Sequence, residues 1–111
     1  MKQITFEYEG KEYTLEYTKN AVRQMERRGF VAEDISTKPM TVIPDLFAGA
    51  FLANHPQTKR DKIDKMYDAI NGKQRLIRAL TDMYNETIEG LLDDVDEGNE
   101  NWTPNFEISE N

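Results

Sequence analysis

The sequence has no cysteine and only one histidine, His55, among its 111 residues. Without cysteine the chain cannot form a disulfide framework, a thiolate nucleophile or a cysteine-ligated zinc or iron–sulfur site, and one histidine cannot build a three-histidine site. No apolar run approaches the roughly 18 residues that a membrane-spanning helix needs. The opening residues lead directly into a strand pattern instead of a signal peptide. We therefore expect a protein of a reducing compartment with no metal, no cofactor, no membrane contact and no enzymatic activity.

Basic residues are missing from the end of the chain. Residues 85–111 contain nine Asp and Glu and no Lys or Arg, whereas residues 1–84 contain the other 12 acidic and all 14 basic residues. The formal charge of −7 is thus the sum of a body near +2 and an end at −9. This balance argues against nucleic-acid binding by the whole surface. The run of acids and its low hydrophobicity predict a flexible acidic tail over residues 93–111.

The first part of the chain has the alternation of a β-hairpin. Apolar and polar residues alternate on both sides of Glu9-Gly10, which has the composition of a two-residue turn. The register expected from that turn pairs Phe6 with Tyr13 and Glu7 with Glu12. We predict a hairpin over residues 3–17 as the β part of an α+β domain that covers residues 1–92.

Helical periodicity replaces this alternation after residue 18. Thr18 is a candidate N-cap for a first helix, and Thr41 is a candidate N-cap for an unusually apolar second one. Thr58 with Asp61 resembles a capping box, and Asn85 is a candidate cap for a short last helix. The predicted helices, four to five in number, cover residues 19–28, 42–54, 59–70, 73–84 and 86–92.

Two groups of apolar residues are candidate partner-binding sites. The first lies on the helix predicted over residues 42–54, which carries more apolar surface than a small core needs. An exposed apolar patch of this kind marks a partner site. The same residues would also suit the core. The second consists of aromatic and aliphatic anchors within the acidic tail, a pattern typical of segments that fold on binding. The candidates are Val42, Ile43, Leu46, Phe47, Phe51 and Leu52 in the helix, and Trp102, Phe106 and Ile108 in the tail.

Other chemical motifs are weaker. His55 has no Ser or Cys motif to act on and is expected to be structural. The acidic run from Asp93 to Gly98 does not have calcium-loop spacing, because Pro104 would occupy the position of the bidentate Glu. The basic stretch 59–78 lacks free aromatic residues for stacking on bases. Nucleic-acid binding is therefore not expected.

Several stretches together resemble the small tail assembly chaperones of long-tailed phages and prophages of Gram-positive bacteria. They are Ile4-Thr5-Phe6-Glu7-Tyr8-Glu9-Gly10-Lys11-Glu12-Tyr13-Thr14-Leu15-Glu16-Tyr17, Gly29-Phe30-Val31-Ala32, Lys38-Pro39-Met40-Thr41, Leu46-Phe47-Ala48-Gly49-Ala50-Phe51-Leu52-Ala53 and Met83-Tyr84-Asn85-Glu86. The resemblance covers about residues 1–92, and it lies in the order of the stretches instead of in any single motif.

The resemblance implies a non-enzymatic function. Such chaperones coat the aggregation-prone tape measure protein during tail assembly and help to recruit tail tube subunits; they work in the host bacterial cytoplasm and are absent from the mature virion. In many phages a frameshift appends a second domain, and this chain resembles the short form. The apolar helix would then supply part of a client groove or a self-association surface.

Two other functions remain open from the sequence. One is an acidic, phage-encoded inhibitor that mimics DNA and blocks a host nuclease, although its acids crowd into the predicted tail instead of a rigid array. The other is a head–tail connector component that stays in the particle.

Overall fold

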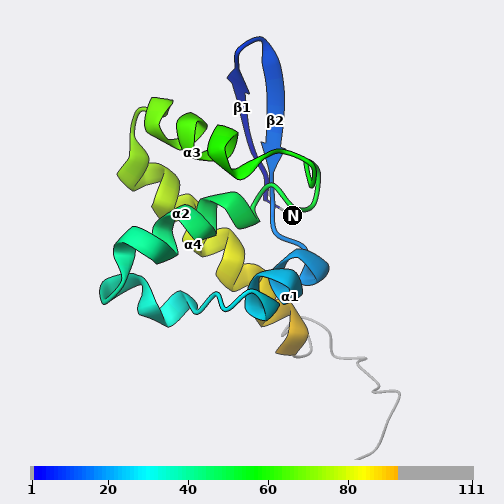
Figure 1. Ribbon diagram of the computed structural model, residues 1–111. Coiled ribbons are helices and arrows are strands. Elements are labelled where there is room, and N and C mark those ends of the chain that lie inside the picture. Colours follow the sequence, from blue (N-terminus) through cyan, green and yellow to red (C-terminus); the bar gives the residue numbers. More distant parts are fainter. Residues whose placement is uncertain (1, 93–111) are drawn as a thin grey trace, which may run out of the picture.

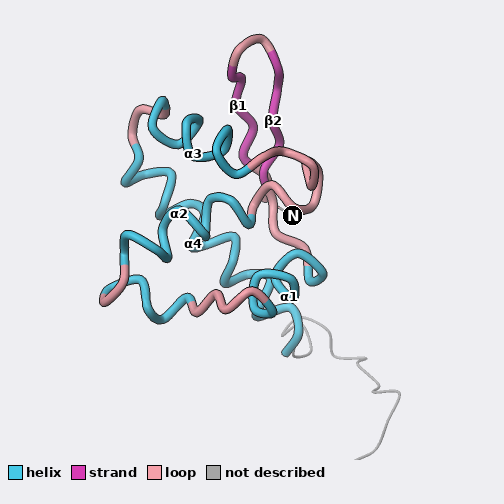
Figure 2. The backbone as a smooth tube through the Cα atoms, in the orientation of Figure 1, coloured by secondary structure: helices cyan, strands magenta, loops and turns pink. Residues whose placement is uncertain are grey.

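A computed structural model describes residues 2–92 of the chain. An antiparallel β-hairpin is followed by four α-helices and two short 3₁₀ helices, as expected for the α+β class (Figures 1 and 2). The hairpin stands at one end of the molecule, and its tip extends beyond the helices. The predicted tail, residues 93–111, lies outside the described residues.

The hairpin consists of β1 (Ile4–Tyr8) and β2 (Lys11–Leu15). Its register is the one expected from the two-residue turn: Phe6 lies opposite Tyr13, and Glu7 opposite Glu12. Glu9 and Gly10 both have positive φ, 52° and 79°, as a type I′ turn requires at its two central positions. The turn chemistry therefore sets the register locally.

Helix α1 (Lys19–Arg27) begins and ends where its sequence signals lie. The Thr18 hydroxyl accepts a hydrogen bond from the Ala21 N–H at 3.1 Å, which confirms the predicted N-cap. Gly29 follows the helix with a φ of 93°, the left-handed conformation that favours glycine. A 3₁₀ helix, η1 (Ala32–Ser36), then leads to the next helix.

The predicted boundaries of the second helix were wrong at both ends. Helix α2 covers Pro39–Gly49, so Thr41 lies inside it and is not the cap. Pro39 occupies the first turn, where a missing N–H costs nothing. Pro44 cannot donate a hydrogen bond to the carbonyl of Met40, but Met40 lies in the exposed start of the helix, so the missing bond is tolerated. Three successive N–H groups, those of residues 50–52, bond back to carbonyls three residues earlier. This tightening ends the helix before residue 54.

The two helices predicted over residues 73–84 and 86–92 form one continuous α-helix followed by a 3₁₀ turn. Helix α3 (Arg60–Ala69) agrees with its prediction except at the start, where Lys59 is the N-cap and Thr58 makes no capping bond. Helix α4 (Lys73–Glu89) continues through Asn85 and ends at a 3₁₀ turn, η2 (Gly90–Leu92). No Gly or Pro interrupts α4, and the Thr87 hydroxyl donates to the carbonyl of Tyr17.

The core lies between the hairpin and the helices. Helix α2 is central to it and packs against α1, α3 and α4. Aromatic rings connect the elements: Phe47 of α2 meets Tyr67 of α3 edge to face at 5.3 Å, and Tyr17 meets Tyr84 of α4 at 5.6 Å. The buried cluster comprises Tyr13, Leu15, Tyr17, Val22, Met25, Phe30, Val42, Leu46, Phe47, Ala50, Phe51, Ile63, Met66, Leu80, Met83 and Tyr84.

Candidate interaction site

The structure divides the partner-binding residues predicted within residues 42–54 into two groups. Four of them, Val42, Leu46, Phe47 and Phe51, are buried in the core. They are therefore not available as a surface groove, and the expectation that they contact a partner directly is corrected. The reason is that α2 is surrounded by three helices and the hairpin, so most of its apolar surface is covered.

Two predicted residues keep some exposure. Ile43 and Leu52 are each partly exposed, and Leu52 lines a cleft of about 330 Å³. The three tail candidates, Trp102, Phe106 and Ile108, lie outside the described residues. Phe51 lines the same cleft but is only 1% exposed, so Leu52 is the predicted cleft residue that keeps exposed surface.

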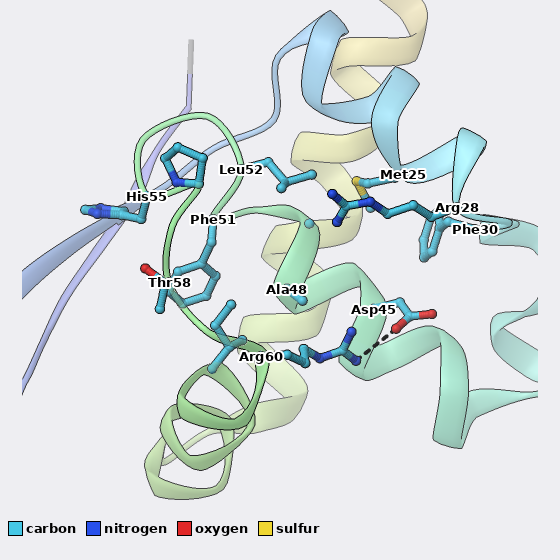
Figure 3. Close-up of a pocket in the computed structure, with 13 residues that line it drawn as sticks. Met25, Arg28, Phe30, Asp45, Ala48, Phe51, Leu52, His55, Thr58 and Arg60 are labelled. Atoms are coloured by element: carbon cyan, nitrogen blue, oxygen red, sulfur yellow. Dashed lines mark hydrogen bonds and ion pairs between the residues drawn. The ribbon is translucent and has the colours of Figure 1, made fainter.

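The cleft is formed where the end of α1, the second half of α2 and the start of α3 meet the 50–58 loop (Figure 3). Its lining combines apolar side chains with charged groups at the rim. The lining residues are Met25, Arg28, Phe30, Asp45, Ala48, Gly49, Phe51, Leu52, His55, Pro56, Thr58, Arg60 and Ile63.

Small residues on α2 give the cleft its depth. Ala48 faces the opening between Arg28 and Arg60 (Figure 3). At the next position a Cβ atom on Gly49 would lie only 2.9 Å from the Cγ of buried Met25. Glycine therefore leaves room for the Met25 side chain of α1 against α2. Larger residues at 48 and 49 would fill the cleft or separate the two helices.

The two arginines at the rim differ in their partners. Arg60 donates to Asp45 at 2.9 Å and to Asp64 at 3.1 Å. Burial lowers the pKa of Arg60, but its hydrogen bonds to these carboxylates outweigh that effect and raise the pKa overall. Arg28 is exposed and forms no ion pair within residues 2–92. Among the contacts of residues 2–92, the rim thus holds one arginine paired with carboxylates and one arginine without an ion pair.

The loop that forms one wall of the cleft is fastened to the hairpin. The His55 Nε2 accepts a hydrogen bond from the Thr14 N–H at 3.0 Å, so the ring proton resides on Nδ1. Asn54 Nδ2 donates to the Thr14 carbonyl at 3.2 Å and to the buried Glu16 carboxylate at 2.7 Å. Burial, and secondarily the charge of Lys11, lowers the pKa of His55. The histidine is therefore a neutral structural acceptor, as expected from its lack of catalytic partners.

Within residues 2–92, no group of three or more His, Cys, Asp or Glu side chains is placed to hold a metal ion. No helix in that part of the chain is long and apolar enough to cross a membrane. The chemistry that the cleft offers is contact with an apolar group at its floor and a charge-assisted hydrogen bond at its rim.

The family model described as "Domain of unknown function (DUF5055)" matches residues 1–106. The chain belongs to the DUF5055 family. No curated protein and no solved structure matches it. The DUF5055 match includes all residues of the cleft, and it extends past residue 92 to include Trp102 and Phe106 but not Ile108.

The sequence prediction missed most of this site. Arg28 is the C-cap of α1, whereas Ala48 lies in α2 and Arg60 in α3, and each is an ordinary residue in its local pattern. Only the small pair Ala48-Gly49 inside an apolar helix could have signalled a close approach by a neighbouring element. The position of the cleft follows from the packing of α1 and α3 on α2.

Proposed function

We propose that this DUF5055 protein is a phage tail assembly chaperone that binds and solubilises the tape measure protein. The observation that supports binding is the cleft, which combines a partly exposed apolar floor at Ala48 and Leu52 with Arg28 at its rim, an exposed side chain that has no ion pair within residues 2–92. The resemblance of residues 1–92 to tail assembly chaperones supplies the client. The role is one of binding, with no catalysis.

The cleft suits one apolar side chain of a helical client. An amphipathic helix presents anchors at spacings of three and four residues to a groove, and a volume of about 330 Å³ accepts one large anchor. A client carboxylate one turn away from that anchor would accept hydrogen bonds from Arg28, whose guanidinium reaches over the cleft (Figure 3). Arg60 is already paired with Asp45, so it positions the rim.

The wider assignment rests on the same resemblance. The protein would act in the host bacterial cytoplasm, assist the recruitment of tail tube subunits and be absent from the mature virion. Trp102, Phe106 and Ile108 would provide a second contact with the client, since aromatic anchors are enriched among residues that dominate binding energy. The DUF5055 match over residues 1–106 includes two of these three anchors.

The test is co-expression with the tape measure protein, measured as the fraction of the client that stays in the supernatant. Arg28→Glu reverses the free charge at the rim, and Arg27→Glu makes the same change at an exposed neighbour that does not line the cleft. Leu52→Gln makes the floor polar, and Leu91→Gln is its control at a position 60% exposed. We expect the two cleft variants to lose client solubilisation and the two controls to retain it.

Circular dichroism of each variant establishes that the fold is intact. Equal solubilisation by the Arg28→Glu and Arg27→Glu proteins would show that the rim has no special role. Equal loss of client solubilisation in the Arg28→Glu and Arg27→Glu proteins would show that binding depends on the overall surface charge and not on the cleft. A client that is insoluble with the wild-type chaperone would contradict the proposed function itself.

A further inference from the structure

The two edges of the hairpin differ in how their backbone groups are bonded. On the outer edge of β2, the Thr14 N–H and carbonyl bond to His55 and Asn54, and the Glu16 N–H bonds to the Ala50 carbonyl at 3.2 Å. Residues 50–55, the first part of the 50–58 loop, therefore cover this edge of β2. On the outer edge of β1, the backbone groups of Thr5 and Glu7 have no hydrogen-bond partner within residues 2–92.

The register of the hairpin explains which backbone N–H and carbonyl groups of β1 point away from β2. Tyr8 and Lys11 flank the two-residue turn and form a hydrogen-bonded pair, and such pairs alternate along an antiparallel ladder. The backbone groups of Phe6 and Ile4 consequently point to β2. Those of Thr5 and Glu7 point away from it, along an exposed edge.

Strand β1 also lacks several of the features that protect an edge. It contains no Pro, no Lys and no bulge, each of which hinders unwanted strand pairing in natural sheets. Glu7 is its one charged residue. The apolar residues on its other face, Ile4, Phe6 and Tyr8, pack against the core but are only partly buried. A two-stranded sheet of this kind gains stability from a further strand.

We propose that two copies of the chain pair through their β1 edges, antiparallel about Phe6, and form a four-stranded sheet. In this register Thr5 lies opposite Glu7 of the second copy, twice by symmetry, so all outward N–H and carbonyl groups of these residues are bonded. A register centred on Glu7 would place two carboxylates opposite each other, which is unfavourable, and one centred on Thr5 would place Glu7 opposite Gln3, which lies before the strand. Pairing about Phe6 also aligns the whole of both strands and joins their apolar faces.

The shape of the protein determines where the two helical bodies lie in such a dimer. The hairpin tip extends beyond the helices, whereas the other end of β1 lies beside them (Figure 1). Because Phe6 packs against Phe47 and Phe51, the two helical bodies lie on the same face of the joint sheet, and antiparallel pairing displaces them in opposite directions along the strands. The proposal does not depend on the identity of the client, because it follows from the hairpin alone.

The test combines sedimentation with amide exchange on the full chain. In the wild type we expect a concentration-dependent dimer in analytical ultracentrifugation. NMR hydrogen exchange should show the Thr5 and Glu7 amides protected at high concentration and exchanging rapidly on dilution. The Phe6 amide should be protected at both concentrations, because it bonds within the hairpin.

Charge substitutions at Thr5 test the register. Thr5→Glu creates two like-charge pairs with Glu7 and should raise the dimer dissociation constant about tenfold, whereas Thr5→Lys creates two opposite-charge pairs and should lower it by a similar factor at low salt. Thr41→Glu and Thr41→Lys make the same charge changes at an exposed site on α2 and should have no effect. All four proteins should have wild-type circular dichroism.

A monomer at millimolar concentration with rapidly exchanging Thr5 and Glu7 amides would overturn the proposal and leave the edge to a strand of another protein. A dimer in which those two amides stay unprotected would also overturn it, since the contact would then lie elsewhere. Opposite shifts for the Thr5→Glu and Thr5→Lys proteins, with unchanged controls, would support it.

Discussion

Tyr17→Phe removes a hydrogen bond at the centre of the core without changing the shape of the side chain. Tyr17 is 2% exposed, and its hydroxyl donates to the Leu46 carbonyl at 2.6 Å. That carbonyl lies in the last turn of α2, where backbone acceptors begin to lack partners. Its usual donor, the Ala50 N–H, bonds to Phe47 instead. Tyr17 thus supplies a partner for a buried acceptor of the helix end.

The expected cost follows from what the substitution leaves behind. A buried carbonyl without its donor is destabilising by about 1–3 kcal/mol, and the phenylalanine ring leaves no cavity beyond one oxygen atom. We therefore expect the free energy of unfolding to fall by about 2 kcal/mol, which corresponds to a decrease of about 10 °C in Tm for a domain of this size. Burial raises the pKa of Tyr17 well above its ordinary value, so its hydroxyl is a donor throughout the neutral range.

Tyr84→Phe is the matched control. Tyr84 is also buried and packs edge to face against Tyr17, but its hydroxyl has no hydrogen-bond partner within the described residues. Removing that hydroxyl should change the free energy of unfolding by less than about 0.5 kcal/mol. The measurement is urea unfolding followed by far-ultraviolet circular dichroism, with unchanged slopes for all proteins. Equal losses in the two variants would refute the role assigned to Tyr17.

Two further predictions concern a pH dependence and a helix cap. In the folded state the pKa of His55 lies below its ordinary value of 6.5, so the unfolded chain binds more protons than the folded chain. The free energy of unfolding should therefore decrease as the pH falls through 6.5 toward the folded pKa. The His55→Gln protein should lack this pH dependence in urea unfolding measured at several pH values. Thr18→Ala should reduce the free energy of unfolding by about 1 kcal/mol, because it removes the observed N-cap bond. Thr41→Ala should have almost no effect, since Thr41 lies inside α2, and a comparable loss there would contradict the observed helix start.

The hairpin could be predicted from the sequence because its information is local. Glu9-Gly10 specifies the turn, and the turn specifies the register of every pair. The cap of α1 was predictable for the same reason, since Thr18 bonds to an amide three residues away. In both cases the residues that decide the structure are neighbours in the chain.

The predictions failed where contacts between residues far apart in the sequence determine the structure. A cap at Asn85 was plausible locally, but α4 continues to Glu89, where Thr87 bonds to a carbonyl 70 residues earlier. The apolar helix looked like a partner surface, but α1, α3, α4 and the hairpin cover most of it. The cleft depends on the approach of α1 to Gly49. No periodicity along the chain encodes such an approach.

The 50–58 loop connects the two surfaces proposed for binding. Its first half covers the outer edge of β2 through Asn54 and His55, which leaves β1 as the open edge. Its side chains Leu52 and Thr58 line the cleft, to which β1 contributes no residue. A dimer paired through β1 would therefore leave the lining residues of both clefts outside the paired strands. Because linked sites bind a long client with a higher effective concentration than separate ones, the Thr5→Glu protein should hold the tape measure protein less firmly than the wild type although its cleft is unchanged.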